Sequence, residues 1–99
     1  MTDGRLEASC KPTGGKLVRV SLSLAGGRIE RIAITGDFFI MPESGVEDIE
    51  AALVGADPGA VRARIDAVVR NRGLRLAGVS PASIAEAVRR ALEGGERPA

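Results

Sequence analysis

The chain changes from a strand-like to a helix-like pattern at Gly36-Asp37-Phe38-Phe39-Ile40-Met41-Pro42-Glu43. Before this stretch, apolar residues alternate with polar ones, as in a half-buried β-sheet, and after it they recur at helical spacing. The stretch contains both phenylalanines of the chain, and Pro42 prevents the strand from continuing. The sequence therefore predicts a sheet followed by helices, joined at a crowded corner.

Three antiparallel strands are predicted before the corner, over residues 5–11, 16–24 and 29–36. Glycine-rich turns at residues 12–15 and 25–27 join them into a meander. The residues predicted to face the core are Leu6, Ala8, Cys10, Val18, Val20, Leu22, Leu24, Ile32 and Ile34. The opposite face, with Arg19, Ser21, Ser23, Arg31 and Thr35, is expected to be solvated or to contact a partner.

Three amphipathic helices are predicted after the corner, over residues 44–54, 58–72 and 81–93. Ser44 and Glu47 have the spacing of a capping box, in which each side chain bonds the other residue's amide. Asp57-Pro58 and Ser80-Pro81 each predict an N-cap followed by proline at the first helical position. Residues 74–79 are interpreted as an apolar connector lying on the core.

The predicted order, β-β-β-α-α-α, indicates an α+β fold of two layers, with the helices on one face of the sheet. The 99 residues suit one domain, residues 1–99, whose core is almost wholly aliphatic because aromatic residues make up 2% of the chain. No apolar run is long enough to span a membrane, and the N-terminus does not resemble a signal peptide. A cytoplasmic protein is expected.

The composition argues against several kinds of active site. The chain has no His and no Tyr, so the usual general acid or base near neutral pH is missing. Cys10, the single cysteine, lacks a histidine base and is predicted to be a small core residue. Asp48 and Glu50 are predicted to be solvated charges on a helix surface. No disulfide and no metal site is expected.

The segment Lys11-Pro12-Thr13-Gly14-Gly15-Lys16 is the best polar candidate for a site. It lacks the spacing of a phosphate-binding Walker loop and joins two strands instead of leading into a helix. Two interpretations stay open. The segment is a plain hairpin turn with solvated lysines, or its amides and lysines bring positive charge to a phosphate or carboxylate.

The corner also allows two interpretations. If the third strand keeps its phase, Phe38 faces the helices, whereas Asp37 and Phe39 face away, and Phe39 with Ile40 and Met41 forms a binding patch. If the strand instead ends at Gly36, the chain turns and both rings go inside. Asp37 would then cap the turn before the first helix.

Two segments carry a family resemblance: Lys11-x-x-Gly14-Gly15-Lys16-Leu17-Val18, and Gly36-Asp37-Phe38-Phe39-x-x-Pro42-Glu43. Together with Leu76-x-Gly78-Val79 and the helix that follows, they resemble the C-terminal accessory domain of lipoate–protein ligases, over about residues 6–92. Thr13 stands where many relatives are expected to have proline. The second segment is fairly specific, whereas the glycine-lysine segment alone is weak.

The resemblance implies a separate accessory subunit in a heterodimer with a catalytic ligase subunit. The catalytic subunit would bind ATP, Mg and lipoate, form lipoyl-adenylate and modify a lysine of an acceptor protein, whereas this chain alone would bind no cofactor. The small domain is implied to be needed for activation. From the place of Lys16 in the loop we expect it to be an assisting charge, and we expect the other candidate site residues near the partner or nucleotide: Lys11, Gly14, Gly15, Asp37, Phe38, Phe39 and Pro42. The fold of the small domain is implied to resemble iron–sulfur scaffold proteins.

Three other functions fit the sequence less well. A nucleic-acid-binding domain is disfavoured by a net charge of +1 and by the absence of aromatic residues along the strands. An iron–sulfur assembly factor is suggested by the implied fold alone. A stand-alone enzyme fits least, because His and Tyr are missing. We therefore expect no contact with nucleic acid or membrane.

Overall fold

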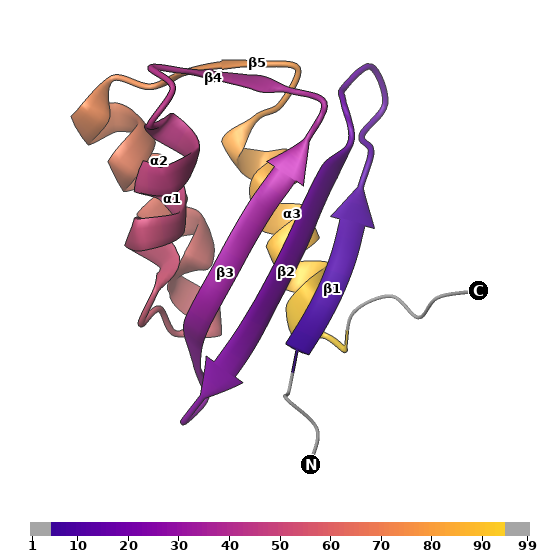
Figure 1. Cartoon of the computed structure of the whole chain (residues 1–99), viewed down its shortest axis with the longest axis vertical. Helices are drawn as coiled ribbons and strands as arrows, with labels where there is room; N and C mark the ends of the chain where they lie inside the picture. Colours follow the sequence, from indigo (N-terminus) through magenta and orange to yellow (C-terminus); the bar gives the residue numbers. More distant parts are fainter. Residues whose placement is uncertain (1–4, 95–99) are drawn as a thin grey trace.

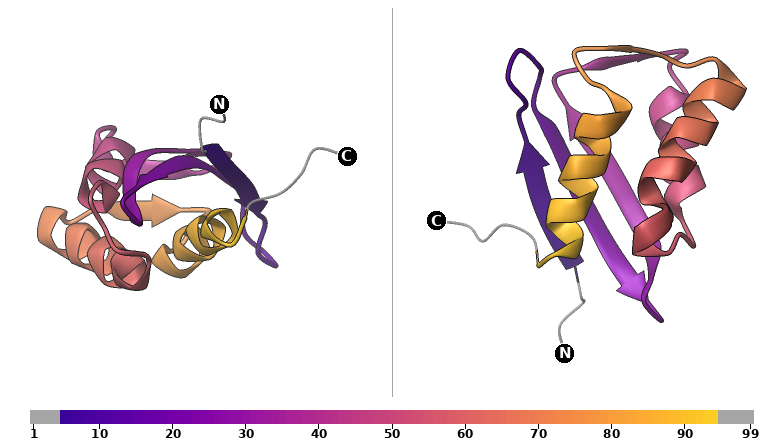
Figure 2. Two further views of the ribbon diagram at one scale, coloured as in Figure 1. Left: turned by 90° about the horizontal axis from the view of Figure 1, so that it is seen from below. Right: turned by 180° about the vertical axis from the view of Figure 1, so that it is seen from behind.

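The computed structural model describes residues 5–94, which form an α+β fold of two layers (Figure 1). A three-stranded antiparallel sheet in the order β1-β2-β3 makes one layer, as expected, and helices cover one of its faces (Figure 2). The elements are β1 (Arg5–Cys10), β2 (Val18–Ala25), β3 (Arg28–Gly36), β4 (Phe39–Met41), α1 (Gly45–Leu53), a 3₁₀ turn (Pro58–Ala60), α2 (Val61–Arg72), β5 (Arg75–Ala77) and α3 (Pro81–Leu92).

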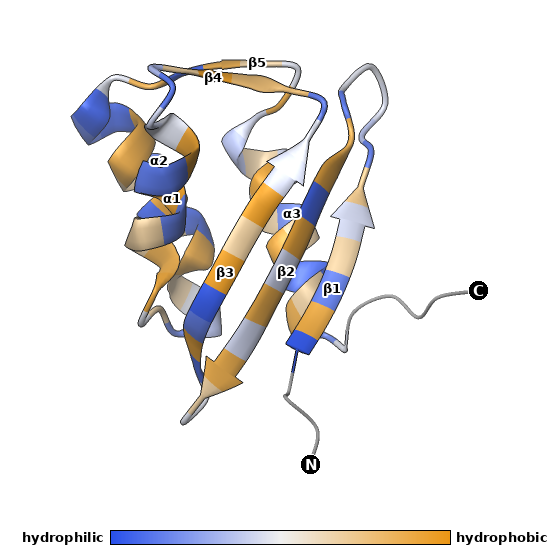
Figure 3. Cartoon of the chain, in the orientation of Figure 1, coloured by the Kyte–Doolittle hydropathy of each residue, from blue (hydrophilic) through white to orange (hydrophobic). Residues whose placement is uncertain are grey.

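The alternation along the strands places the aliphatic side chains under α3. Val20 lies between Ala8 on β1 and Ile34 on β3, and all three side chains are buried. The alternation of hydrophobic and hydrophilic residues along β2 is visible in Figure 3. Cys10 is buried in the same core, as predicted. The opposite face of the sheet carries exposed Arg19 among serines and is not covered by any described element.

An irregularity near the β2–β3 turn changes the phase of the third strand. Ser23 pairs with Arg31, whereas Leu24 pairs with Ile29, so the chain has one extra residue at Glu30. Such a bulge reverses which side chains of a strand face the core. Ile29 is therefore buried, although strict alternation from Ile32 and Ile34 would place it on the opposite face. Leu24, expected in the core, is 37% exposed at the end of β2.

The helix ends agree with the sequence in two places and disagree in one. The Ser80 hydroxyl accepts the amide of Ser83 and begins α3, as predicted. The Asp57 carboxylate accepts the amide of Gly59, but it caps a 3₁₀ turn that leads into α2. The predicted capping box of Ser44 and Glu47 is wrong. Ser44 has helical backbone angles, φ −73° and ψ −3°, and its side chain makes no cap hydrogen bond.

The outer edge of β3 is covered by α1 and the loop after it. Near the start of β3, the Ile29 amide donates to Ala56 O and the Gly55 amide donates to Ile29 O. Further along, the Ile34 amide donates to the Glu50 carboxylate at 2.7 Å. Glu50 is therefore not the solvated surface charge that we predicted. Its carboxylate satisfies an edge amide that the sheet itself leaves without an acceptor.

Removing the Glu50 carboxylate is expected to destabilise the fold. Glu50→Ala leaves the half-buried Ile34 amide without its acceptor, and we expect a loss of about 1–3 kcal/mol in the free energy of unfolding. Urea denaturation measures this loss. Glu47→Ala, on the exposed side of the same helix, is the control and should change the stability by less than about 0.5 kcal/mol. Equal losses for both variants would show that the Glu50 contact is not stabilising.

A second, two-stranded sheet crosses the end of the molecule and was not predicted. β4 pairs antiparallel with β5, with Ile40 opposite Leu76. The interpretation of residues 74–79 as a connector on the core is therefore only partly correct, because Leu74 is buried but the next three residues form a strand. We call this pair of strands the β4–β5 ribbon. It lies across the tops of the main sheet and the helices in Figure 1.

Among the helices of residues 5–94, none combines the length and the apolar character that crossing a bilayer requires.

Candidate functional site

Three segments that are far apart in the sequence meet at one end of the main sheet. The β1–β2 loop, the corner between β3 and β4, and the segment after β5 are joined by main-chain hydrogen bonds. The Lys16 amide donates to Gly78 O at 2.8 Å, and the Asp37 amide donates to Leu17 O at 3.1 Å. The β1–β2 loop is therefore the element that holds the other two segments in place.

Two glycines allow this close approach. A side chain at Gly36 would collide with Leu17 O and lie 2.7 Å from Cε2 of the Phe38 ring. Gly78 has a positive φ of 82°, and a side chain there would lie 2.6 Å from Cγ of Lys16. The stem of Lys16 is therefore packed on the Gly78 backbone. Both glycines belong to the segments that carry the family resemblance.

The two phenylalanines separate as the first interpretation of the corner predicted. Phe38 is half-buried against the core, whereas Phe39 is 75% exposed. The expected reason, one uninterrupted strand, is wrong, because β3 ends at Gly36 and β4 begins at Phe39 with a new partner. The alternative that both rings lie inside is also wrong. Asp37 is exposed and closes the corner through its amide, while α1 begins only at Gly45.

The glycine turn of the β1–β2 loop does not offer its last two amides to an anion. The Gly15 amide donates to Pro12 O at 2.9 Å, and the Lys16 amide is bonded to Gly78 O. Gly14 has a φ of 76° and completes the turn. The interpretation that the amides of this loop bind a phosphate is therefore wrong for Gly15 and Lys16, whose amides already have acceptors. Within the β1–β2 loop, positive charge comes from the exposed side chains of Lys11 and Lys16.

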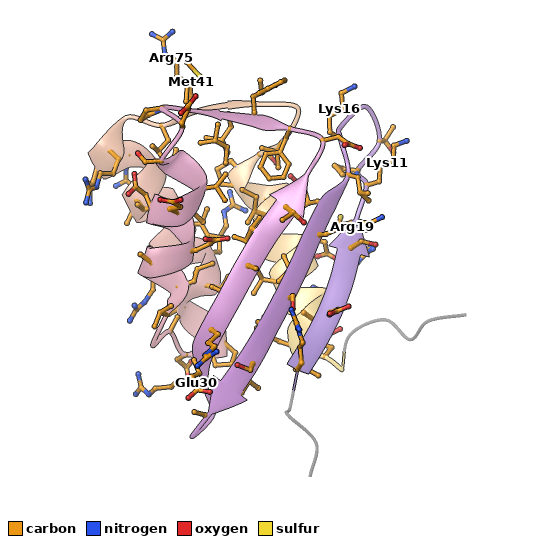
Figure 4. All side chains as sticks on the ribbon, in the orientation of Figure 1. Lys11, Lys16, Arg19, Glu30, Met41 and Arg75 are labelled. Carbon is orange, nitrogen blue, oxygen red and sulfur yellow. The ribbon has the colours of Figure 1, made fainter. Side chains whose placement is uncertain are left out.

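The cations at this end form no ion pair with a carboxylate among residues 5–94. Lys11, Lys16, Arg19 and Arg75 have no carboxylate within 4.0 Å in the described part of the chain. Figure 4 places Lys11, Lys16 and Arg75 at the end that holds the β4–β5 ribbon, and Arg19 lower down on β2. The arginines of α3, in contrast, are ion-paired with a carboxylate. Hydrogen bonds from Arg89 and then Arg90 lower the pKa of Glu86 to about 2.

The expected site residues therefore fall into one connected region. Lys11, Gly14, Gly15 and Lys16 lie in the β1–β2 loop, and Asp37, Phe38 and Phe39 lie at the corner that this loop holds. Pro42 follows β4, and its carbonyl accepts the Gly45 amide at the start of α1. Met41 is exposed, as the predicted binding patch required, but Ile40, expected in the same patch, is buried because it faces the core from the middle of β4. Arg75, which lies opposite Met41 across the ribbon, was not predicted, because a strand of three residues gives too weak a signal.

The described residues contain no group of three or more Cys, Asp or Glu side chains that could hold a metal ion. The region instead offers two kinds of surface side by side. One is the pair of loop lysines, and the other is the exposed apolar face of the ribbon. A surface of this kind suits contact with an anion or with another protein.

Comparison with known proteins shows which family this chain belongs to. No family model matches the chain. A curated relative, lipoate-protein ligase A subunit 2 of Thermoplasma acidophilum, is 37% identical over 76 residues, which cover 74% of this chain and 77% of the relative. The chain belongs to the lipoate-protein ligase A subunit 2 family. The family resemblance inferred from the loop and corner segments is thereby confirmed.

A solved structure supports the same family and the fold. It comes from a structural study of an archaeal lipoylation system, a bi-partite lipoate protein ligase and its E2 lipoyl domain, from the same organism. The two chains superpose with a TM-score of 0.71 at 33% identity, covering 86% of this chain and 92% of the other. The predicted α+β sheet with helices is thus confirmed for this member of the subunit 2 family. The likeness to iron–sulfur scaffold folds stays a prediction.

Proposed function

We propose that this chain is the accessory subunit of a two-chain lipoate–protein ligase and that it is required for the activation of lipoate. The observation that carries the proposal is the similarity to a subunit 2, at 37% identity over most of both chains. The fold match to a chain from the study of a bi-partite ligase supports it. The partner is then a catalytic subunit, and the two chains form a heterodimer.

Activation joins the lipoate carboxylate to ATP. A carboxylate oxygen bonds the α-phosphorus, the bond from that phosphorus to the pyrophosphate oxygen breaks, and pyrophosphate leaves with the displaced electron pair. Negative charge on the α-phosphate and the leaving pyrophosphate increases during this step, so a fixed cation nearby accelerates it. ATP, Mg and lipoate are bound by the complex in this proposal, and this chain supplies the charge of Lys16.

Two features of the chain support a role for Lys16 in particular. Its ammonium group has no carboxylate within 4.0 Å among residues 5–94, so it is available to an external anion. Its amide is bonded to Gly78 O and its stem lies on Gly78, so the side chain starts from a fixed position. A preorganised cation contributes more to a transition state than a mobile one.

The proposal is tested by reconstitution with a catalytic chain. The probe is the catalytic subunit of the bi-partite ligase from Thermoplasma acidophilum, with lipoate, ATP and Mg. We expect a complex of one copy of each chain by analytical ultracentrifugation and pyrophosphate release that requires both chains and lipoate. The catalytic chain alone and the mixture without lipoate are the controls. No complex and no added pyrophosphate release would contradict the proposal.

After activation, the lipoyl group would pass to a lysine of an acceptor protein, which this chain meets only through the complex. The expected acceptors are the lipoyl domains of 2-oxoacid dehydrogenases and the glycine-cleavage H protein. A cytoplasmic location is the expectation that accompanies this role.

A further inference from the structure

The outer face of the β4–β5 ribbon exposes large apolar side chains. Phe39 is 75% exposed and Met41 is 59% exposed, and both point away from the core on the same face of β4. Across the ribbon, Phe39 pairs with Ala77 and Met41 pairs with Arg75. We call Phe39, Met41, Arg75 and Ala77 the ribbon patch.

The fold itself does not account for the ribbon patch. The ribbon is attached to the core through Ile40, which is 6% exposed, and through its partner Leu76. Phe39 and Met41 lie on the other face and contribute little to that attachment. The remaining large exposed apolar residues among residues 5–94, Leu24 and Val54, lie on other elements. An exposed aromatic beside an exposed methionine is typical of a protein-binding surface.

The ribbon patch is also held rigidly. The Lys16 amide donates to Gly78 O directly after β5, and the Asp37 amide, two residues before β4, donates to Leu17 O. The β1–β2 loop thus holds both strands at the end of the ribbon where Phe39 pairs with Ala77. A surface that is already in its binding conformation loses less entropy on association, and its apolar side chains bind more tightly for that reason.

The charge at the patch favours one kind of partner surface. Arg75 stands beside Met41 and has no carboxylate within 4.0 Å in the described part of the chain. Figure 4 shows the labelled Met41 and Arg75 side chains projecting together from the end of the molecule. An apolar pair with an unneutralised arginine at its margin is complementary to an apolar pocket with a carboxylate at its rim.

We infer that the ribbon patch is the surface through which this chain docks on the catalytic subunit of the ligase. Phe39 and Met41 enter an apolar pocket of that subunit, and Arg75 pairs with a carboxylate at the margin of the pocket. This inference rests on the proposed function, which supplies the partner. It goes beyond that function because it assigns the docking to β4 and β5 and adds Arg75 and Ala77 to the interface.

The test measures the affinity of variants for the catalytic subunit of the Thermoplasma acidophilum ligase by isothermal titration calorimetry. Phe39→Ser should weaken binding about 30-fold or more, because buried aromatic anchors dominate such interfaces. Arg75→Glu should weaken it about tenfold and reduce its dependence on salt. Val54→Ser replaces another exposed apolar side chain, 48% exposed at the end of α1 and outside the ribbon patch, and should leave the affinity unchanged. Thermal melts should show that all three variants fold.

The outcomes separate this inference from the proposed function. If the wild-type chain binds and Phe39→Ser binds as tightly, the ribbon patch is not the docking surface, although the proposed function stands. If the wild-type chain does not bind at all, the proposed function fails and this inference fails with it. If sedimentation shows that the chain alone dimerises and Phe39→Ser is monomeric, the patch binds a second copy, and the inference is overturned.

Discussion

Replacing Gly36 by alanine is expected to lower the free energy of unfolding by about 3 kcal/mol. The added methyl group would collide with the carbonyl oxygen of Leu17 and lie 2.7 Å from the Phe38 ring. The first of these neighbours is a backbone carbonyl directly before β2 that accepts the Asp37 amide, so it cannot rotate away as a side chain would. The loss is a large part of the roughly 5–15 kcal/mol that stabilises a domain of this size.

The damage should also reach the proposed docking surface. Moving Leu17 disturbs the hydrogen bond from the Asp37 amide to Leu17 O, and the next residue, Phe38, leads directly into β4. We therefore expect Gly36→Ala to bind the catalytic subunit more weakly even at a temperature at which it is fully folded. Urea denaturation and calorimetry measure the two effects separately.

Gly26→Ala is the matched control. Gly26 has a φ of 60° in the β2–β3 turn, but an added side chain would meet no atom within 4 Å. Its cost should therefore be the backbone term alone, about 1 kcal/mol, and binding should not change. If the two variants lose equal stability, the contact at Gly36 is not what the corner depends on.

Much of the main fold follows from the sequence because its signals are local. Alternation over several residues places Val20 and Ile34 in the core, and the Ser80-Pro81 pair marks the start of α3. The separation of Phe38 from Phe39 was also predicted, but from a strand continuity that does not exist. The residue pattern of the corner correctly predicts that the two rings point to opposite sides. The structural cause of this orientation is the pairing of β4 with a distant strand.

What the sequence did not provide depends on contacts between distant segments. A strand of three residues has too little alternation to be recognised, so the ribbon emerges only when residues 39–41 meet residues 75–77. Glu50 resembles any helix-surface acid until the edge of β3 is placed beside it. At Ser44 the capping-box spacing is present, but the turn from Pro42 to Gly45 gives Ser44 helical angles that the motif does not allow.

The proposed charge of Lys16 predicts the largest effect on activity. Lys16→Met keeps the part of the side chain that lies on Gly78 and removes only the ammonium group. At saturating partner concentration, we expect the rate of lipoate-dependent pyrophosphate release to fall about 100-fold, the cost of removing one charge-stabilising donor. Lys16→Ala should lose as much rate and, in addition, some packing on Gly78.

The comparison with neighbouring variants distinguishes catalysis from docking. Lys16→Met should bind the catalytic subunit with nearly wild-type affinity, because Lys16 lies outside the ribbon patch, and its loss should be in the rate at saturation. Lys16→Arg should recover part of the rate, whereas Lys11→Met, at the other end of the same loop, should change it only a few-fold. If Lys16→Met released pyrophosphate at the wild-type rate, the lysine would not assist activation. The subunit would then act by docking alone, ordering the catalytic site and excluding water from it.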